Sequence, residues 1–211
     1  MRIHDLNFVV PEYERSYDTY ESDIVELMKL VPENHTPIIE LGAAIGVVSC
    51  VVNKKFNPTR QTVIEANPHL IPILEQNRKN NGCNFEIINK AFSYQKECTF
   101  YIHKSFVASS EKNPDSPSNV EKITVSTLTL KDLMKEKSIL IVDIEGTEID
   151  LINNELPLMK EKALYTIIEF HKRMTGQWKI YKAIWKLRLN RFKIIGQNED
   201  TIVFKNKNIN F

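Results

Sequence analysis

The chain has 211 residues, which is enough for one α/β domain with a substantial core and too few for two ordinary domains. Apolar residues make up 42% and charged residues 26%, and no apolar run approaches the length of a membrane helix. A net charge of +1 gives no support to a nucleic-acid enzyme, because such enzymes gain most of their affinity from basic residues. We therefore expect one domain, 1–211, without a nucleic-acid or membrane partner.

Strand and helix patterns alternate along the sequence. We predict strands at 38–41, 62–66, 85–88, 99–103, 138–144 and 164–170. We predict helices at 22–30, 46–53, 67–81, 129–136, directly after Gly146, and at 178–190. Two further strands, 192–195 and 201–204, flank a polar turn and predict a C-terminal antiparallel hairpin. This order is typical of an α/β fold with a mainly parallel central sheet and helices on both faces.

Several local details belong to this prediction. Residues 1–36 form a helical lead-in, and the strand at 99–103 lies beside the one at 85–88. Asn67 is the N-cap of a helix whose first residue is Pro68, and Gly82 ends that helix in a left-handed conformation.

Two later segments carry expectations of their own. The polar segment 104–122 is a loop, for which a lid over the acceptor and an ordinary surface loop are equal alternatives. In the helix at 178–190 we expect four side chains to face the core: Tyr181, Ile184, Trp185 and Leu189.

The three cysteines, Cys50, Cys83 and Cys98, match neither a zinc spacing nor a disulfide framework. Free buried thiols are the simpler interpretation. The N-terminus lacks the features of a secretory signal peptide, and both observations favour a cytoplasmic location.

The first predicted strand carries an acid, Glu40, and leads into a loop of small residues. That loop consists of Gly42, Ala43, Ala44, Ile45 and Gly46. Small residues let the backbone approach a ligand, and the helix that follows offers free N–H groups. The dinucleotide-binding glycine pattern is absent, and a carboxylate here would repel a pyrophosphate but could pair with the ammonium group of S-adenosylmethionine. We predict a loop that binds this cofactor, with a tight turn that binds nothing as the alternative.

A second acid, Glu65, ends the next strand about 25 residues later, close to the spacing of a ribose-binding acid. One carboxylate can accept hydrogen bonds from both ribose hydroxyls. We predict that Glu65, with Ala66 and Asn67, binds the cofactor, and the alternative is a solvated strand end. Lys90 and Ala91, in the turn after the third strand, are expected to line the adenine.

Two more strands end in titratable groups. Asp143 and Glu145 lie at the carboxyl end of the apolar strand at 138–144, and Glu169 and His171 lie at the carboxyl end of the strand at 164–170. Side chains two residues apart on a strand point the same way, and open α/β sheets bind ligands at this edge. Helix capping by Thr147, completed by Asp150, is the alternative, but it leaves Asp143 unexplained.

With these motifs the chain resembles the FkbM-type methyltransferases over about residues 20–204. The matching segments are 40–46, 63–68 and 143–148, together with 127–133 and 169–171. Glu40 and Ala44 stand where that family usually has Asp and Asn, and Val142 stands where a lysine is common. The resemblance implies a Rossmann-like class I methyltransferase that uses S-adenosyl-L-methionine and methylates hydroxyl groups of sugars or natural products.

We therefore expect a small acceptor, such as a glycan or glycosylated metabolite. His171, Asp143 and Glu169 are the candidate catalytic residues, and Asp143 and Glu145 also border the cofactor. His171 is the first choice of base because its ordinary pKa is near neutral. No metal is assumed, although the carboxylate oxygens of this cluster could hold Mg²⁺ or Ca²⁺. Two alternatives stay open: a nucleic-acid methyltransferase, which a clustered Lys/Arg face would favour, and a module that binds the cofactor without turnover.

Overall fold

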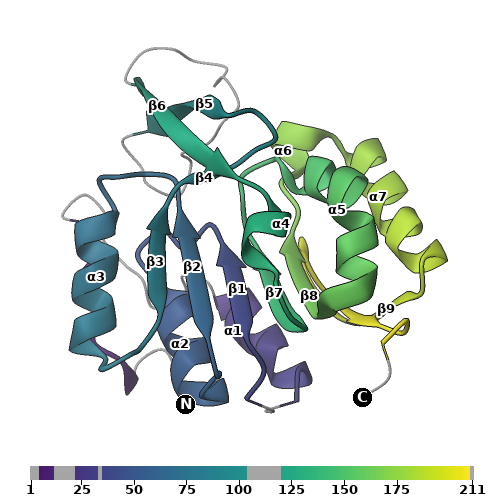
Figure 1. Ribbon diagram of the computed structural model, residues 1–211, viewed down its shortest axis with the longest axis horizontal. Helices are drawn as coiled ribbons and strands as arrows, with labels where there is room; N and C mark the ends of the chain where they lie inside the picture. Colours follow the sequence, from purple (N-terminus) through teal and green to yellow (C-terminus); the bar gives the residue numbers. More distant parts are fainter. Residues whose placement is uncertain (1–4, 12–21, 33–34, 104–119, 210–211) are drawn as a thin grey trace.

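The computed structural model describes residues 5–11, 22–32, 35–103 and 120–209 (Figure 1). Its helical elements are α1 (Ser22–Leu27), the 3-10 turn η2 (Met28–Leu30), α2 (Val47–Phe56), α3 (Ile71–Asn80), α4 (Leu130–Leu133), α5 (Glu148–Lys162), α6 (Lys172–Thr175) and α7 (Gln177–Leu189). Its strands are β1 (Ile38–Leu41), β2 (Gln61–Glu65), β3 (Glu86–Asn89), β4 (Ala91–Phe92), β5 (Glu97–His103), β6 (Val120–Leu128), β7 (Ser138–Val142), β8 (Ala163–Glu169), β9 (Phe192–Asn198) and β10 (Thr201–Asn206).

Seven strands form the central sheet in the order β3-β2-β1-β7-β8-β10-β9. The first five of these are parallel, and β10 runs antiparallel to both β8 and β9. The chain winds outward from β1 to β3 and then returns to β7 on the other side of β1 (Figure 1). This reversal between β1 and β7 opens a ligand position at the carboxyl edge of the sheet. The predicted Rossmann-like fold, with its C-terminal hairpin, is confirmed.

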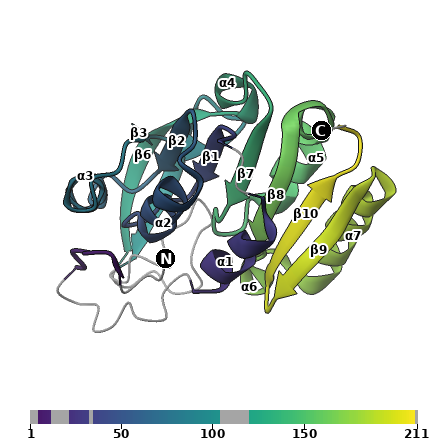
Figure 2. The ribbon, with the colours of Figure 1, turned by 90° about the horizontal axis from the view of Figure 1, so that it is seen from below.

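Helices cover both faces of the sheet (Figure 2). On one face the core contains buried side chains of α4, α5 and α7, such as Leu130, Leu151 and Leu187. On the other face it contains side chains of α1 and α2, such as Ile24 and Val52. Because the central strands are buried on both sides, nearly all their residues are apolar.

A second, smaller sheet lies beyond the carboxyl edge of the first (Figure 1). Its order is β4-β6-β5, with β5 antiparallel to β6. The prediction that 99–103 pairs with 85–88 is therefore wrong, since these residues pair with β6. Residues 120–122 of the predicted loop also belong to β6, whose outward side chains are polar. The rest of that loop, and the lid interpretation with it, falls outside the described residues.

Two details at the N-terminal side differ from expectation. The helix predicted from Asn67 begins at Ile71, because the Asn67 side chain accepts the His69 N–H and a turn precedes the helix. Among the described residues of the lead-in, α1 and η2 make 22–30 helical. Residues 7–10 are not helical, and the side chain of Asn77 on α3 holds both the N–H and the carbonyl of Val9. Gly82 ends α3 with φ +54°, as predicted.

The inward face of α7 also differs from expectation. Its buried residues are Ile180, Ala183 and Leu187. Ile184 packs against the core as predicted, but the inward placement of the other three residues is wrong. Tyr181, Trp185 and Leu189 are 47%, 60% and 75% exposed, respectively. Both sets of residues have helical spacing, and the structure buries the smaller side chains.

Gly42 joins the two halves of the sheet at the reversal. Its φ is +85°, and a Cβ atom built there would lie 1.6 Å from the carbonyl oxygen of Asp143. The loop after β1 and the loop after β7 can therefore touch only because this position has no side chain.

We expect Gly42→Ala to destabilise the fold strongly, and Gly176→Ala is a matched control. Gly176 has φ +80°, but a methyl group at this position would have no atom within 4 Å. Both variants put a side chain on a backbone with positive φ, which costs about 1–3 kcal/mol. Because its methyl group also overlaps other atoms, Gly42→Ala should lower the free energy of unfolding in urea by at least about 2 kcal/mol more than Gly176→Ala does. Equal losses in the two variants would contradict the close contact.

Candidate functional site

The loop between β1 and α2 is held by a carboxylate from the next strand. Ala44 has a left-handed backbone, with φ 46°, and its N–H donates to Oε2 of Glu65 at 2.7 Å. The other oxygen of Glu65 accepts the N–H of Asn67 at 2.6 Å. From below the loop, Nδ2 of Asn77 donates to the carbonyl of Ile45 at 2.8 Å. The loop is thus fixed in shape by contacts within the protein.

Glu65 is buried where β2 ends. Burial raises the pKa of its carboxyl to about 7, although the N–H groups of Asn67 and Ala44 favour the ionised form and lower it. The alternative of a solvated strand end does not describe this residue, which is only 6% exposed. A buried acceptor next to a loop of small residues is suited to bind hydroxyl groups.

The remaining predicted cofactor residues lie on β1, between β3 and β4, and on β4. Glu40 is buried, and it shares a face of β1 with Ile38, which packs with α2. Ala91 is buried in β4, whereas Lys90 is half-buried in the preceding turn. The Asn89 side chain donates to the carbonyls of Glu65 and Ala66, which ties the ends of β3 and β2 together.

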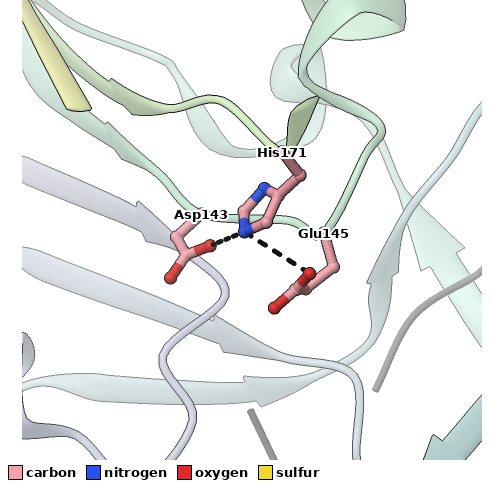
Figure 3. A group of neighbouring side chains, drawn as sticks. All are labelled: Asp143, Glu145 and His171. Atoms are coloured by element: carbon pink, nitrogen blue, oxygen red, sulfur yellow. Dashed lines mark ion pairs between the residues drawn. The ribbon is translucent and has the colours of Figure 1, made fainter. Parts of the chain in front are cut away.

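Three predicted residues meet on the other side of the reversal (Figure 3). Nε2 of His171 lies 3.3 Å from Oδ1 of Asp143 and 3.4 Å from Oε2 of Glu145. Strand β7 ends at Val142, so both acids lie in the following loop rather than on the strand. They converge because Glu145 takes a left-handed backbone, with φ 47°.

A fourth residue, Glu148, was missed by the sequence analysis. It is completely buried at the start of α5, where Nδ1–H of His171 donates to its Oε1 at 2.7 Å. The N–H of Gly146 donates to the same oxygen at 2.8 Å. The sequence analysis included Glu148 in the matching segment 143–148 but gave it no role. The capping alternative itself is wrong, since Thr147 makes no side-chain cap and its hydroxyl donates to the Ile144 carbonyl.

The ionisation of this group follows from its contacts. Burial alone would lower the pKa of His171, but the hydrogen bond to Glu148 and the charges of Asp143, Glu148 and Glu145 outweigh it and raise the pKa to about 10. Burial raises the pKa of Glu145 to about 7, against the opposing effect of His171. His171 is therefore an imidazolium at neutral pH, with Glu145 half-ionised beside it.

Glu169 is not part of the close group. It ends β8, and burial raises the pKa of its carboxyl. The His171 charge opposes that rise, so Glu169 interacts with the group through its charge.

The same group could receive a divalent cation. Asp143, Glu145 and His171 each offer one ligand atom, and these atoms lie within 4.8 Å of one another. A cation would have to displace the proton that His171 carries, because only the neutral imidazole is a ligand.

Comparisons with known proteins agree with the fold. The model of the family described as methyltransferase FkbM domain matches residues 40–194. A search of curated protein sequences found no significant match.

Solved structures resemble the whole fold. A methyltransferase from Pyrococcus furiosus is 9% identical, with 96% of this chain and 89% of that chain covered and a TM-score of 0.57. Precorrin-6y C5,15-methyltransferase from Geobacter metallireducens is 11% identical, with coverages of 94% and 92% and a TM-score of 0.52. Fibrillarin from Aeropyrum pernix, solved with natively bound S-adenosyl-L-methionine, is 12% identical, with coverages of 85% and 71% and a TM-score of 0.50. These likenesses confirm the class I Rossmann-like methyltransferase fold.

The charge on His171 predicts a pH-dependent stability. The pKa of His171 in the folded state lies above the ordinary value of 6.5. The stabilisation that its charge supplies is therefore complete below about pH 6.5 and is lost as the pH rises towards 10. The difference in unfolding free energy between the natural protein and His171→Gln should shrink over this range. Its slope should approach, at most, about 1.4 kcal/mol per pH unit, the limit for one proton.

Urea unfolding of both proteins at a series of pH values measures this difference. Parallel stability profiles for the two proteins would show that His171 is not held as a cation.

Proposed function

Since the chain belongs to the FkbM methyltransferase domain family, we propose that it transfers a methyl group from S-adenosyl-L-methionine to a hydroxyl group of a sugar or another small molecule. One observation carries the proposal: a loop of small residues backed by Glu65 faces a charged Asp143–Glu145–His171 group across the reversal between β1 and β7. A methyl donor on one side and an acceptor on the other would meet at this point.

The cofactor side of the site fits S-adenosyl-L-methionine. Glu65 would accept the ribose hydroxyls, since it is a buried carboxylate at the end of β2. Loop residues 42–46 would lie along the methionine end, with Glu40 as the partner of its ammonium group. Lys90 and Ala91 would line the adenine, next to the Asn89 side chain that fixes the strand ends.

The bound cofactor supplies an electrophilic methyl group on a sulfonium, and the protein aligns the acceptor with it. As the acceptor oxygen forms its bond to the methyl carbon and the carbon–sulfur bond breaks, the hydroxyl proton must pass to a base. His171 was the expected base, but it already carries a proton at neutral pH. We assign the role of proton acceptor to Glu145, which is 23% exposed beside His171. Its pKa near 7 suits this role. His171, with Asp143 and Glu148, would hold Glu145 in place.

The location of basic residues bears on the nucleic-acid alternative. Arg188, Arg191, Lys193 and Lys207 line one open hollow. It lies where β9 begins, and β9 begins at the end of the sheet opposite the carboxyl edge. Basic residues placed there do not lead a nucleic acid to Asp143 and Glu145, so the small acceptor is the better supported substrate.

The proposal is tested with a panel of glycosides and labelled S-adenosyl-L-methionine. Formation of an O-methylated glycoside, detected by mass spectrometry, is the expected result. Binding of the cofactor without turnover on any acceptor would favour the non-catalytic module, and methylation of RNA alone would favour the nucleic-acid enzyme.

We predict that cofactor affinity depends on the ionisation of Glu65. Ribose hydroxyls donate to the carboxylate, so binding should strengthen as Glu65 loses its proton near pH 7. Affinity for S-adenosylhomocysteine should rise by up to about tenfold between about pH 6 and pH 8, measured by calorimetry. Glu65→Gln should bind more weakly, with a flatter profile. Because the ligand's own titration is common to both proteins, identical profiles would remove the ribose assignment.

We also predict that acceptor-side variants separate turnover from cofactor binding. Glu145→Gln and Asp143→Asn should lower kcat by about 10²–10⁴-fold, the usual effect of removing a general base or its support. Affinity for S-adenosylhomocysteine should change little. Chelation with EDTA should leave the rate unchanged, since the proton on His171 already balances the carboxylates. If EDTA abolished the activity and Mg²⁺ restored it, a metal ion rather than Glu145 would activate the hydroxyl group.

A further inference from the structure

The outer face of α7 carries a continuous apolar stripe. Trp178, Tyr181, Trp185 and Leu189 follow one another at spacings of three and four residues, so they lie in line along the helix. Trp178 is 78% exposed and Leu189 is 75% exposed. Both views place α7 at the periphery of the molecule, beside α5 and β9 (Figures 1 and 2). Large apolar side chains in such a row usually mark a contact surface.

The charges around this stripe have one sign. Between residues 177 and 193 there is no Asp or Glu, and six cations occur: Lys179, Lys182, Lys186, Arg188, Arg191 and Lys193. By helical spacing, Lys182 and Lys186 lie on one side of the stripe and Arg188 lies on the other. The hollow lined by Arg188, Arg191, Lys193 and Lys207 continues this positive surface and has a volume of about 640 Å³. A chain with a net charge of only +1 thus concentrates cations at one place.

We propose that this face of α7 docks on the surface of an anionic lipid membrane. Tryptophan, tyrosine and leucine in a row, with lysine and arginine on both sides, is the composition of a helix that lies in the headgroup layer. The rings enter the boundary between headgroups and acyl chains, while the cations contact lipid phosphates. None of the described helices has the length and hydrophobicity needed to span a bilayer. The contact is therefore peripheral and reversible.

Charge argues against a second copy of the chain as the partner. In a twofold interface the same face would meet itself, so the lysines and arginines of α7 would be brought against one another. The described part of α7 offers no acid to neutralise them.

Ring geometry argues against a single-stranded nucleic acid, which needs open ring faces for base stacking. The Arg188 guanidinium already lies over the Trp185 ring, 5.6 Å from its centroid. Trp178 and Tyr181 contact each other edge to face, with centroids 6.2 Å apart. Leu189 extends the stripe without offering any ring.

The stripe also starts close to the candidate site. Strand β8 ends at Glu169, His171 follows, and Trp178 comes only seven residues after His171. Docking through α7 would therefore hold the carboxyl edge of the sheet near the lipid headgroups.

The two tryptophans of the chain, Trp178 and Trp185, are both on this face, so intrinsic fluorescence reports on it directly. We expect a blue shift of the emission and co-sedimentation with vesicles of phosphatidylcholine mixed with phosphatidylglycerol. Neither should occur with phosphatidylcholine alone, and high salt should weaken the binding.

Two variants and one control test the surface. Lys182→Glu should lower the vesicle partition constant at least about fivefold, the effect of one cation at an anionic surface. Leu189→Glu should lower it about tenfold or more, because it puts a charge into the apolar stripe. Lys79→Glu changes an exposed lysine on α3, at the other end of the sheet, and should bind as the natural protein does. A midpoint of urea unfolding equal to that of the natural protein shows that each variant is folded.

Several results would overturn the proposal. These are absence of binding to anionic vesicles, equal weakening by Lys79→Glu and Lys182→Glu, and a dimer in vesicle-free solution that Leu189→Glu separates. A preference for an RNA oligonucleotide that displaces the protein from vesicles would also overturn it. None of these measurements depends on methyl transfer, so the outcome is independent of the proposed activity.

Discussion

The ion cluster centred on His171 is the interaction on which the site depends. Three carboxylates lie within 3.4 Å of its ring nitrogens, and one of them, Glu148, is completely buried. Ionised acids in such proximity repel one another, and burial increases the repulsion, so a cation among them is required. The imidazolium also joins the end of β8 to the loop after β7, because its two nitrogens contact residues on either side of Gly146. The shape of the acceptor side therefore follows from charge balance.

The opposite side of the site is shaped by contacts of backbone groups. Glu65 receives N–H groups from the loop after β1 and from the turn after β2, while Gly42 lets the first of these loops rest against Asp143. This backbone contact is short and rigid. In the methyl transfer that we propose, the separation of donor and acceptor must be fixed closely, and this contact would fix it. The two sides thus differ in the interactions that fix their shape. Backbone packing fixes one side, and balanced charges fix the other.

The sequence predicted those features of the site that depend only on the direction of the strands. Parallel strands present their carboxyl ends at one edge, so acids after β1, β2 and β7 could be expected to gather there. Other features depend on contacts between distant parts of the chain, which no local sequence pattern encodes. Glu148 resembles a helix-capping acid, and only the fold brings His171 to it. In α7 two stripes have helical spacing, and hydrophobicity favoured the aromatic one although the sheet buries Ile180 and Leu187. Pairing of β5 with β6 was missed because the partner strand is polar on one side.

Glu145 has a consequence for how this protein could be stabilised. It sits in the left-handed region with φ 47°, directly before Gly146, in a conformation that costs an ordinary residue about 1–2 kcal/mol. Glycine would relieve that strain, so a selection for heat resistance alone would favour losing the carboxylate. The residue that we propose as the base is therefore one that engineering for thermostability would favour replacing. Here rigidity and chemistry compete for a single position, and consensus design of this domain should leave position 145 untouched.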